Sequence, residues 1–133
     1  DLHHTQTADM AKPWEECMVQ ISTDAEYEES IAYKGLTCME VYAGWCGTCT
    51  AAIPTLKKLH WDLVEERSAA VVFVSCNSDN VEVLKEFKDR SKPLFLIFRK
   101  GAKVQTIEGV NTYALKTFIE DAAPSKADIA AEE

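Results

Sequence analysis

The sequence predicts an α/β fold in which a central mixed sheet carries helices on both of its faces. Two observations lead to this fold class. Short, continuous apolar runs of the kind that form buried strands alternate with segments whose apolar residues recur at helical spacing. Near the end of the chain, the turn-forming pair Lys100-Gly101 separates two strand-like runs and predicts an antiparallel hairpin. The expected order of elements is therefore β-α-β-α-β-α-β-β-α.

Five segments have the composition of strands, and the clearest is a run of six apolar or small residues that we expect to be buried on both faces. A first helix is expected to begin near Asp24, because Ser22 and Thr23 offer capping side chains, and to end at Gly35. The expected strands are residues 18–22, 37–42, 71–76, 94–98 and 104–107.

Three further helices are expected from apolar spacing. Residues 46–67 form the longest, and Pro54 inside it removes one backbone hydrogen bond and predicts a kink. Residues 80–90 are amphipathic, and Asn111 is placed to cap a last helix that ends near Ala122. The apolar positions that define these faces are Ile53, Leu56, Leu59, Leu63, Val64, Val81, Leu84, Phe87, Leu115, Phe118 and Ile119.

Length and charge limit the domain organisation and the partners. The 133 residues are expected to form one domain at 14–123, with a lead at 1–13 that is flexible or a short helix and an acidic, alanine-rich tail at 124–133 whose order in isolation the sequence leaves open. No apolar run approaches the roughly 20 residues of a membrane span, and no secretory signal is visible. The net charge of −8 argues against nucleic acid or an anionic membrane as a partner. We therefore expect a cytoplasmic protein.

The motif Trp45-Cys46-Gly47-Thr48-Cys49 is the strongest functional signal. It follows an expected strand and opens an expected helix, so its two thiols lie on one face, where they can form a disulfide. The free N–H groups and partial positive charge of a helix N-terminus favour the thiolate of Cys46. A zinc site is the alternative, but it needs a second ligand pair at matching spacing, which the other cysteines do not supply. A redox dithiol without metal or other cofactor is the better interpretation.

The other three cysteines have no comparable motif. An odd count of five cannot be paired completely within one chain, which favours a reducing compartment over a disulfide-stapled scaffold. Cys38 and Cys76 stand in strongly apolar strands and are expected to be small core residues. The role of Cys17 stays open.

The element order, the Cys-x-x-Cys motif, Pro54 eight residues after the first cysteine and Pro93 before an apolar strand together resemble the thioredoxin superfamily. The resemblance covers about residues 17–122. It implies that Cys46 is the attacking cysteine and Cys49 the resolving one. It also implies that Pro93 is the cis-proline facing them, which leaves backbone groups open to pair with an extended substrate.

The chain departs from the family at several positions. Thr48 and Thr50 stand where the family usually has proline and lysine, and Lys92 precedes the expected cis-proline instead of an apolar residue or threonine. Glu40 takes the position of the buried aspartate. The lysine that commonly pairs with that acid has no equivalent, because Phe73 is expected at its position.

A narrower resemblance is to the thioredoxin-type light chains of ciliary outer-arm dynein and the related thioredoxin–nucleoside diphosphate kinase proteins. It rests on residues 40–46, on Lys92-Pro93 with the following strand, and on Gly109-Val110-Asn111. The length leaves no room for a kinase domain, which favours a light chain. This resemblance implies a subunit in the axoneme of a cilium or flagellum, bound to the dynein heavy chain or other outer-arm subunits. The alternative is a free cytosolic protein-disulfide reductase.

Each site residue has a functional and a structural interpretation. Glu40 is expected to relay a proton to Cys49, because burial of a carboxyl group raises its pKa; a purely structural acid is the alternative. Trp45, Gly47, Thr48, Lys92, Pro93 and Gly109 are expected to shape the docking surface for a disulfide-bearing protein. For Trp45, plain packing would serve equally well, and for Gly109 a backbone bend before Asn111 is the alternative.

Overall fold

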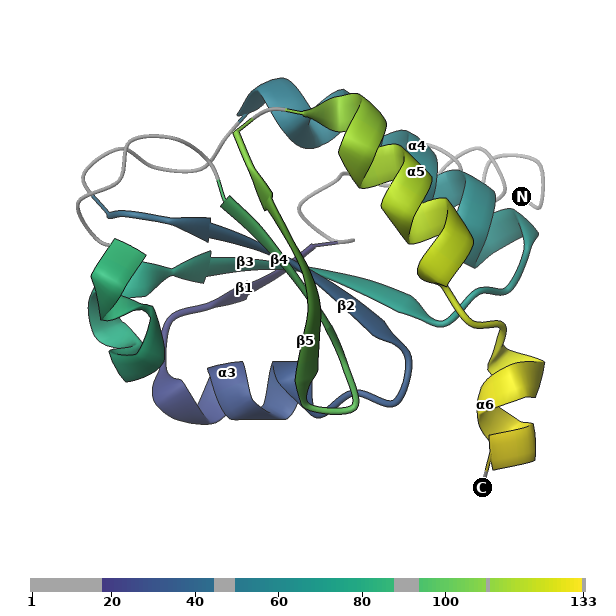
Figure 1. Cartoon of the computed structure of the whole chain (residues 1–133), viewed down its shortest axis with the longest axis horizontal. Coiled ribbons are helices and arrows are strands. Elements are labelled where there is room, and N and C mark those ends of the chain that lie inside the picture. Colours follow the sequence, from purple (N-terminus) through teal and green to yellow (C-terminus); the bar gives the residue numbers. More distant parts are fainter. Residues whose placement is uncertain (1–17, 45–49, 88–93, 110, 133) are drawn as a thin grey trace, which may run out of the picture.

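A five-stranded mixed sheet forms the centre of the computed structural model, which describes residues 18–44, 50–87, 94–109 and 111–132 (Figure 1). The strand order is β1-β3-β2-β4-β5. β1 (Met18–Ile21), β3 (Val71–Asn77) and β2 (Leu36–Tyr42) are parallel. β4 (Leu94–Arg99) runs antiparallel to β2, and β5 (Ala102–Glu108) forms the hairpin with β4. The five predicted strands are thus confirmed, each to within two residues at its ends.

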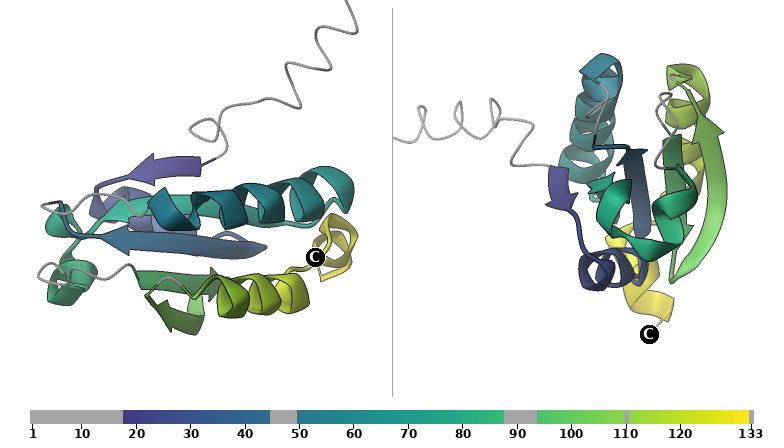
Figure 2. Two further views of the ribbon diagram at one scale, coloured as in Figure 1. Left: turned by 90° about the horizontal axis from the view of Figure 1, so that it is seen from above. Right: turned by 90° about the vertical axis from the view of Figure 1, so that its left-hand side faces the viewer.

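Helices cover both faces of the sheet (Figure 2). α3 (Asp24–Ile31) and the 3₁₀ segment η4 (Glu82–Phe87) pack on one face. α4 (Ile53–Leu59), the π-helical segment η2 (His60–Glu66) and α5 (Thr112–Ala122) pack on the other. The α/β fold class predicted from the sequence is confirmed.

The sheet separates two apolar cores because successive side chains of a strand point to opposite faces. In β2, Leu36 and Cys38 belong to the core under α4 and α5, whereas Met39 and Val41 belong to the core under α3. Glu40 follows the same alternation and therefore points to the α4 side, at the end of the strand.

Two helices begin at the capping residues that the sequence predicts. The Thr23 hydroxyl accepts a hydrogen bond from the Glu26 amide, and the Glu26 carboxylate accepts one from the amide of Ser22, the residue before the cap. The Asn111 side chain accepts from the Ala114 amide at 3.0 Å and starts α5.

The predicted helix at 46–67 is described from Thr50 onward and is segmented. It begins with a 3₁₀ turn, η1 (Thr50–Ala52), continues as α4, and ends in the π-helical η2. Pro54 lies in the first turn of α4, where its missing amide has no intrahelical partner to lose. The change from 3₁₀ to α geometry therefore falls beside Pro54.

One expected helix differs from the structure. Residues 80–90 were expected to form one helix, but the described part consists of two short 3₁₀ segments, η3 (Ser78–Asn80) and η4. Three apolar side chains there recur at intervals of three, which suits the three-residue turn of a 3₁₀ helix. They are Val81, Leu84 and Phe87.

The acidic tail, whose order the sequence leaves open, forms α6 (Lys126–Glu132). The Ala70 amide donates to the Pro124 carbonyl at 2.8 Å, and Ala69 and Ser125 form an isolated β-bridge. Glu132 pairs with Arg99 at 2.8 Å and also with Lys100. These contacts hold the tail against the amino end of β3 and the β4–β5 turn.

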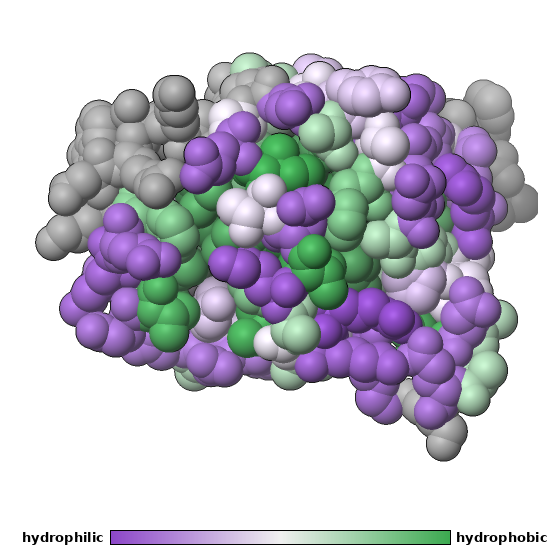
Figure 3. All heavy atoms as spheres, viewed as in Figure 1, coloured by the Kyte–Doolittle hydropathy of each residue, from purple (hydrophilic) through white to green (hydrophobic). Residues whose placement is uncertain are grey.

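One face of the molecule shows how hydrophilic and hydrophobic residues are distributed. On the face drawn in Figure 3, hydrophilic residues surround hydrophobic groups that lie over β5 and along α5. Of the described helices, none is long and apolar enough to cross a membrane.

Candidate functional site

The carboxyl ends of β2 and β3 lie side by side and create a cluster of polar residues. The two strands are parallel and in register, with Glu40 opposite Ser75 and Tyr42 opposite Asn77. The start of β4 and the end of β5 reach the same edge, because Leu94 pairs with both Val41 and Glu108. We call this edge the polar edge; its members are Glu40, Tyr42, Gly44, Ser75, Asn77 and Asp79.

The chain leaves the polar edge directly into the dithiol motif. Most of the predicted site residues lie there or in the segment before β4, and both segments are outside the described residues. Their predicted roles therefore stay predictions; the residues are Trp45, Cys46, Gly47, Thr48, Cys49, Lys92 and Pro93. Glu40 and Gly109 are described.

Glu40 is a buried acid at the polar edge. Only 3% of its surface is exposed, although it stands six residues before the first cysteine of the motif. The Ser75 hydroxyl donates a long hydrogen bond of 3.5 Å to its carboxylate. A buried carboxyl group in an otherwise apolar strand is costly, so its presence favours a chemical role.

The strand register identifies the neighbour of Glu40 on β3. Phe73, which the resemblance places at the position of the family's lysine, pairs with Cys38, two positions before Glu40. Ser75 is the residue of β3 opposite Glu40. The neighbour on β3 is thus a neutral hydroxyl that can hydrogen-bond to the acid, and neither a lysine nor a phenylalanine.

Cys38 and Cys76 are core thiols, as predicted. Both are free and almost completely buried. Burial raises the pKa of the Cys38 thiol, and the nearby Glu40 carboxylate raises it further. Burial also raises the pKa of Cys76, to about 12, with a smaller contribution from Glu26. Because the thiolate is the nucleophile, neither thiol is suited to exchange chemistry.

Gly109 follows β5 at the polar edge and adopts a φ of +76°, a conformation that favours glycine. A Cβ atom at this position would meet no described atom within 4 Å. The bend before Asn111 thus accounts for the glycine, and docking of a partner backbone there remains a prediction.

Two residues at the polar edge escaped the sequence analysis. Asp79 accepts a hydrogen bond from the Gly44 amide at 3.3 Å. Burial raises the pKa of Tyr42, and Cys76, Glu40 and Asp79 act in the same direction. Both residues stand at or just beyond strand ends, which is the signal that could have identified them, since parallel strands place such residues together.

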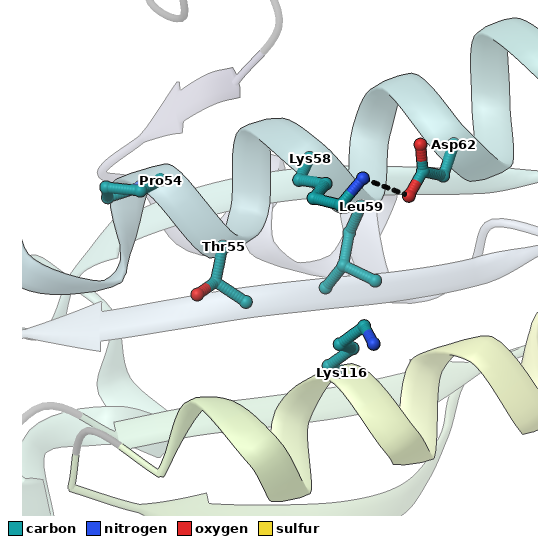
Figure 4. A pocket seen from close by; sticks show the side chains of 6 residues that line it. All are labelled: Pro54, Thr55, Lys58, Leu59, Asp62 and Lys116. Carbon is teal, nitrogen blue, oxygen red and sulfur yellow. Dashed lines mark ion pairs between the residues drawn. The ribbon is translucent and has the colours of Figure 1, made fainter.

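The described residues also form a groove between α4 and α5, with a volume of about 210 Å³ (Figure 4). Thr55 and Leu59 point from α4 towards α5, and Lys116 reaches back from α5. Lys58 is paired with Asp62 at 3.1 Å on the rim. In the part of the chain that is described, no cluster of three His, Cys, Asp or Glu side chains could hold a metal ion.

Comparisons with known proteins agree with this geometry. Residues 18–121 match the thioredoxin family. The 16 kDa light chain of the flagellar outer-arm dynein of Chlamydomonas reinhardtii is 36% identical over 110 residues, which are 82% of this chain and 70% of that protein. The 14 kDa light chain from the same arm is 35% identical over 104 residues, 77% of this chain and 78% of its own length.

A solved structure gives the same result for the fold. Mitochondrial thioredoxin 3 of Saccharomyces cerevisiae, in its oxidized form, superposes with a TM-score of 0.62 at 28% identity. The superposition covers 78% of this chain and 94% of the yeast protein. Since the family match extends from β1 through nearly all of α5, this chain belongs to the thioredoxin family and is similar to the thioredoxin-type light chains of flagellar outer-arm dynein.

Proposed function

We propose that this chain is a light chain of ciliary or flagellar outer-arm dynein and that its Cys46–Cys49 dithiol undergoes thiol–disulfide exchange. The similarity to two outer-arm light chains, each over more than three quarters of this chain, is the observation that carries the first half. Burial of Glu40 next to the motif supports the second half.

The proposed exchange begins with the Cys46 thiolate. It attacks one sulfur of a protein disulfide, forms a mixed disulfide and releases the other sulfur as a thiolate, which takes up a proton. Cys49 then attacks the Cys46 sulfur, so that the second substrate sulfur leaves. Two electrons pass from the dithiol to the substrate, and the chain retains the Cys46–Cys49 disulfide. Glu40 is the proposed acceptor of the proton that Cys49 must lose.

A buried acid suits this transfer because a carboxylate in an apolar environment is a stronger base than one in water. The Ser75 hydroxyl donates a long, neutral hydrogen bond to Glu40, which favours the charged carboxylate less strongly than a cationic donor would. A lysine in its place would favour the charged carboxylate and weaken it as a base.

The proposed protein partners are the dynein heavy chain or other outer-arm subunits in the axoneme. Lys92, just before the predicted cis-proline, places a positive charge in the predicted docking surface and favours an acidic segment of the partner. Gly109 lies at the same edge of the sheet, so this surface would extend from the dithiol to the end of β5.

Retention of the chain on isolated axonemes tests whether it is a subunit of the outer-arm dynein. We expect the epitope-tagged chain, expressed in ciliated cells, to stay with demembranated axonemes at low salt and to be extracted with the outer-arm dynein at high salt. A Cys46→Ser variant should behave alike if binding is non-covalent, and Lys92→Glu should weaken retention. A chain lost entirely with the soluble fraction at low salt would contradict the light-chain assignment.

A free protein-disulfide reductase is the second candidate, favoured by the superposition on a mitochondrial thioredoxin. The test is insulin-disulfide reduction driven by a thioredoxin reductase. A subunit with a narrow docking surface should turn over slowly in isolation. Fast turnover together with absence from axonemes would select the reductase.

A further inference from the structure

One contact fixes the path of the chain as it leaves β2. The Gly44 amide, two residues before Cys46, donates a hydrogen bond of 3.3 Å to Oδ1 of Asp79. Asp79 lies in η3, immediately after β3, and is 35 positions away in the sequence. The contact therefore joins the two loops that follow the central parallel strands.

Space, and not backbone conformation, accounts for the glycine at position 44. Its φ is outside the left-handed range that Gly101 and Gly109 adopt, so other residues could take up the same backbone angles. A Cβ atom at position 44, however, would lie 2.2 Å from Oδ2 of Asp79, far inside van der Waals contact. The carboxylate occupies the volume that any side chain at position 44 would need.

The backbone of Asp79 is held in place by a second hydrogen bond. Its amide donates to Oδ1 of Asn77 at 2.9 Å, which closes a local turn at the end of β3. An added Cβ would require the carboxylate to rotate, which would alter the geometry of the bond to Gly44. In the observed geometry, the hydrogen bond and a Cβ atom at position 44 therefore compete for the same space.

We propose that Asp79 is a positioning residue for the dithiol: by holding the Gly44 amide, it sets the position from which the chain continues into the Cys-x-x-Cys motif. This inference rests on the proposed exchange chemistry for its functional readout. Both Gly44 and Asp79 are exposed, so the contact would otherwise be an ordinary loop–loop bond with an effect on stability alone. Only the positioning role predicts that loss of the contact changes the redox equilibrium of the two thiols.

A double-mutant cycle tests the contact. Gly44→Ala should destabilise the chain in the native background, where the methyl group collides with Asp79. In the Asp79→Ala background the same substitution should be neutral or stabilising, because alanine restricts the unfolded chain more than glycine does. Unfolding by urea measures all four proteins. Additive effects would overturn the proposed contact.

The redox equilibrium with glutathione tests the positioning role. The positioning role requires that the Asp79–Gly44 bond be stronger in one redox state of the Cys46–Cys49 pair than in the other. With the whole contribution of the bond, about 0.5–1.5 kcal/mol, confined to one state, Asp79→Ala should change the equilibrium constant by about twofold to tenfold. Asp79→Asn keeps an acceptor oxygen without the charge and should stay near the native value. Asp121→Ala, which removes another exposed carboxylate, is the matched control and should leave the constant unchanged.

The outcomes separate this inference from the proposed function. An unchanged constant in Asp79→Ala would overturn the positioning role, and an Asn variant that behaves like the Ala variant would assign the effect to charge instead. If the native dithiol forms no disulfide at all, the proposed exchange function fails. The four-protein stability cycle still tests the contact in that case.

Discussion

Selective alkylation of the reduced chain tests which thiols can react. The five cysteines compete for iodoacetamide, and the reaction requires the thiolate. At pH 7, a thiol with a pKa of about 12, as for Cys76, is ionised in about one molecule in 100,000. An ordinary thiol with a pKa near 9 is ionised in about one in 100. Ionisation alone thus slows Cys76 about 1,000-fold.

Burial slows the core thiols further. Cys38 is 1% exposed and Cys76 is fully buried, so the reagent reaches either one only when the structure opens. Cys46 has neither handicap if it stands at a helix N-terminus, where its thiolate is favoured. We therefore expect Cys46 to be labelled first and the two core thiols to be spared on the same timescale.

Brief treatment at pH 7 followed by peptide mapping gives the result for each cysteine separately. Labelling in concentrated urea is the control, because all five cysteines should then react. Labelling of Cys38 or Cys76 in the folded chain as fast as Cys46 would refute both the burial argument and the assignment of the nucleophile.

Three further predictions follow from the polar edge, the core thiols and the tail. Because their pKa values are raised by folding, Cys38 and Cys76 stabilise the chain below pH 9, and the free energy of unfolding should fall by about 1.4 kcal/mol per pH unit per thiol as the pH rises from 9 towards 12. Urea titrations should show a shallower fall for Cys76→Ala; an identical fall would contradict this. Glu40→Gln should slow the resolving step about 100-fold and spare the first attack in single-turnover insulin reduction, and an unchanged pH profile would leave Glu40 a structural acid. Hydrogen bonds from Lys100 and Arg99 lower the pKa of Glu132 below 4.5, so the attachment of the end of α6 should weaken as the pH falls through that lowered value, and also in Glu132→Gln. Proteolysis within the tail measures this, and an unaltered cleavage rate would count against it.

The sheet could be predicted from the sequence because burial on both faces requires apolar side chains throughout β2, β3 and β4. The segment after β3 was harder to predict. Val81, Leu84 and Phe87 satisfy a helical pattern only at intervals of three, and the Asp24 carboxylate accepts a hydrogen bond from the Glu82 amide at 2.8 Å across the chain. A contact between residues 58 positions apart cannot be found from local spacing.

The strand register limited how much of the site could be predicted from the sequence. The sequence identified Glu40 as an unusual acid, but its neighbour on β3 depended on alignment with the next strand, where a shift of two residues exchanges Ser75 for Phe73. The start of α6, by contrast, has a local signal in the sequence. Ser125 and Asp128 bond each other's amides at the start of α6, and this capping pattern is visible in the sequence.

The reactivity of Cys46 can show at which end of the sheet a partner binds. The dithiol follows the carboxyl end of β2, whereas α6 is fixed at the amino end of β3, beside a cavity of about 580 Å³ between the end of α3, the β4–β5 turn and α6. A partner bound at the α6 end would leave Cys46 as reactive as in the free chain. A partner bound over Lys92 and Gly109, as proposed, would cover the thiol. We therefore expect slower iodoacetamide labelling of Cys46 in the axoneme-bound chain than in the isolated one. Both samples are labelled under reducing conditions, and labelling after denaturation is the control. Equal rates would move the docking surface away from the dithiol.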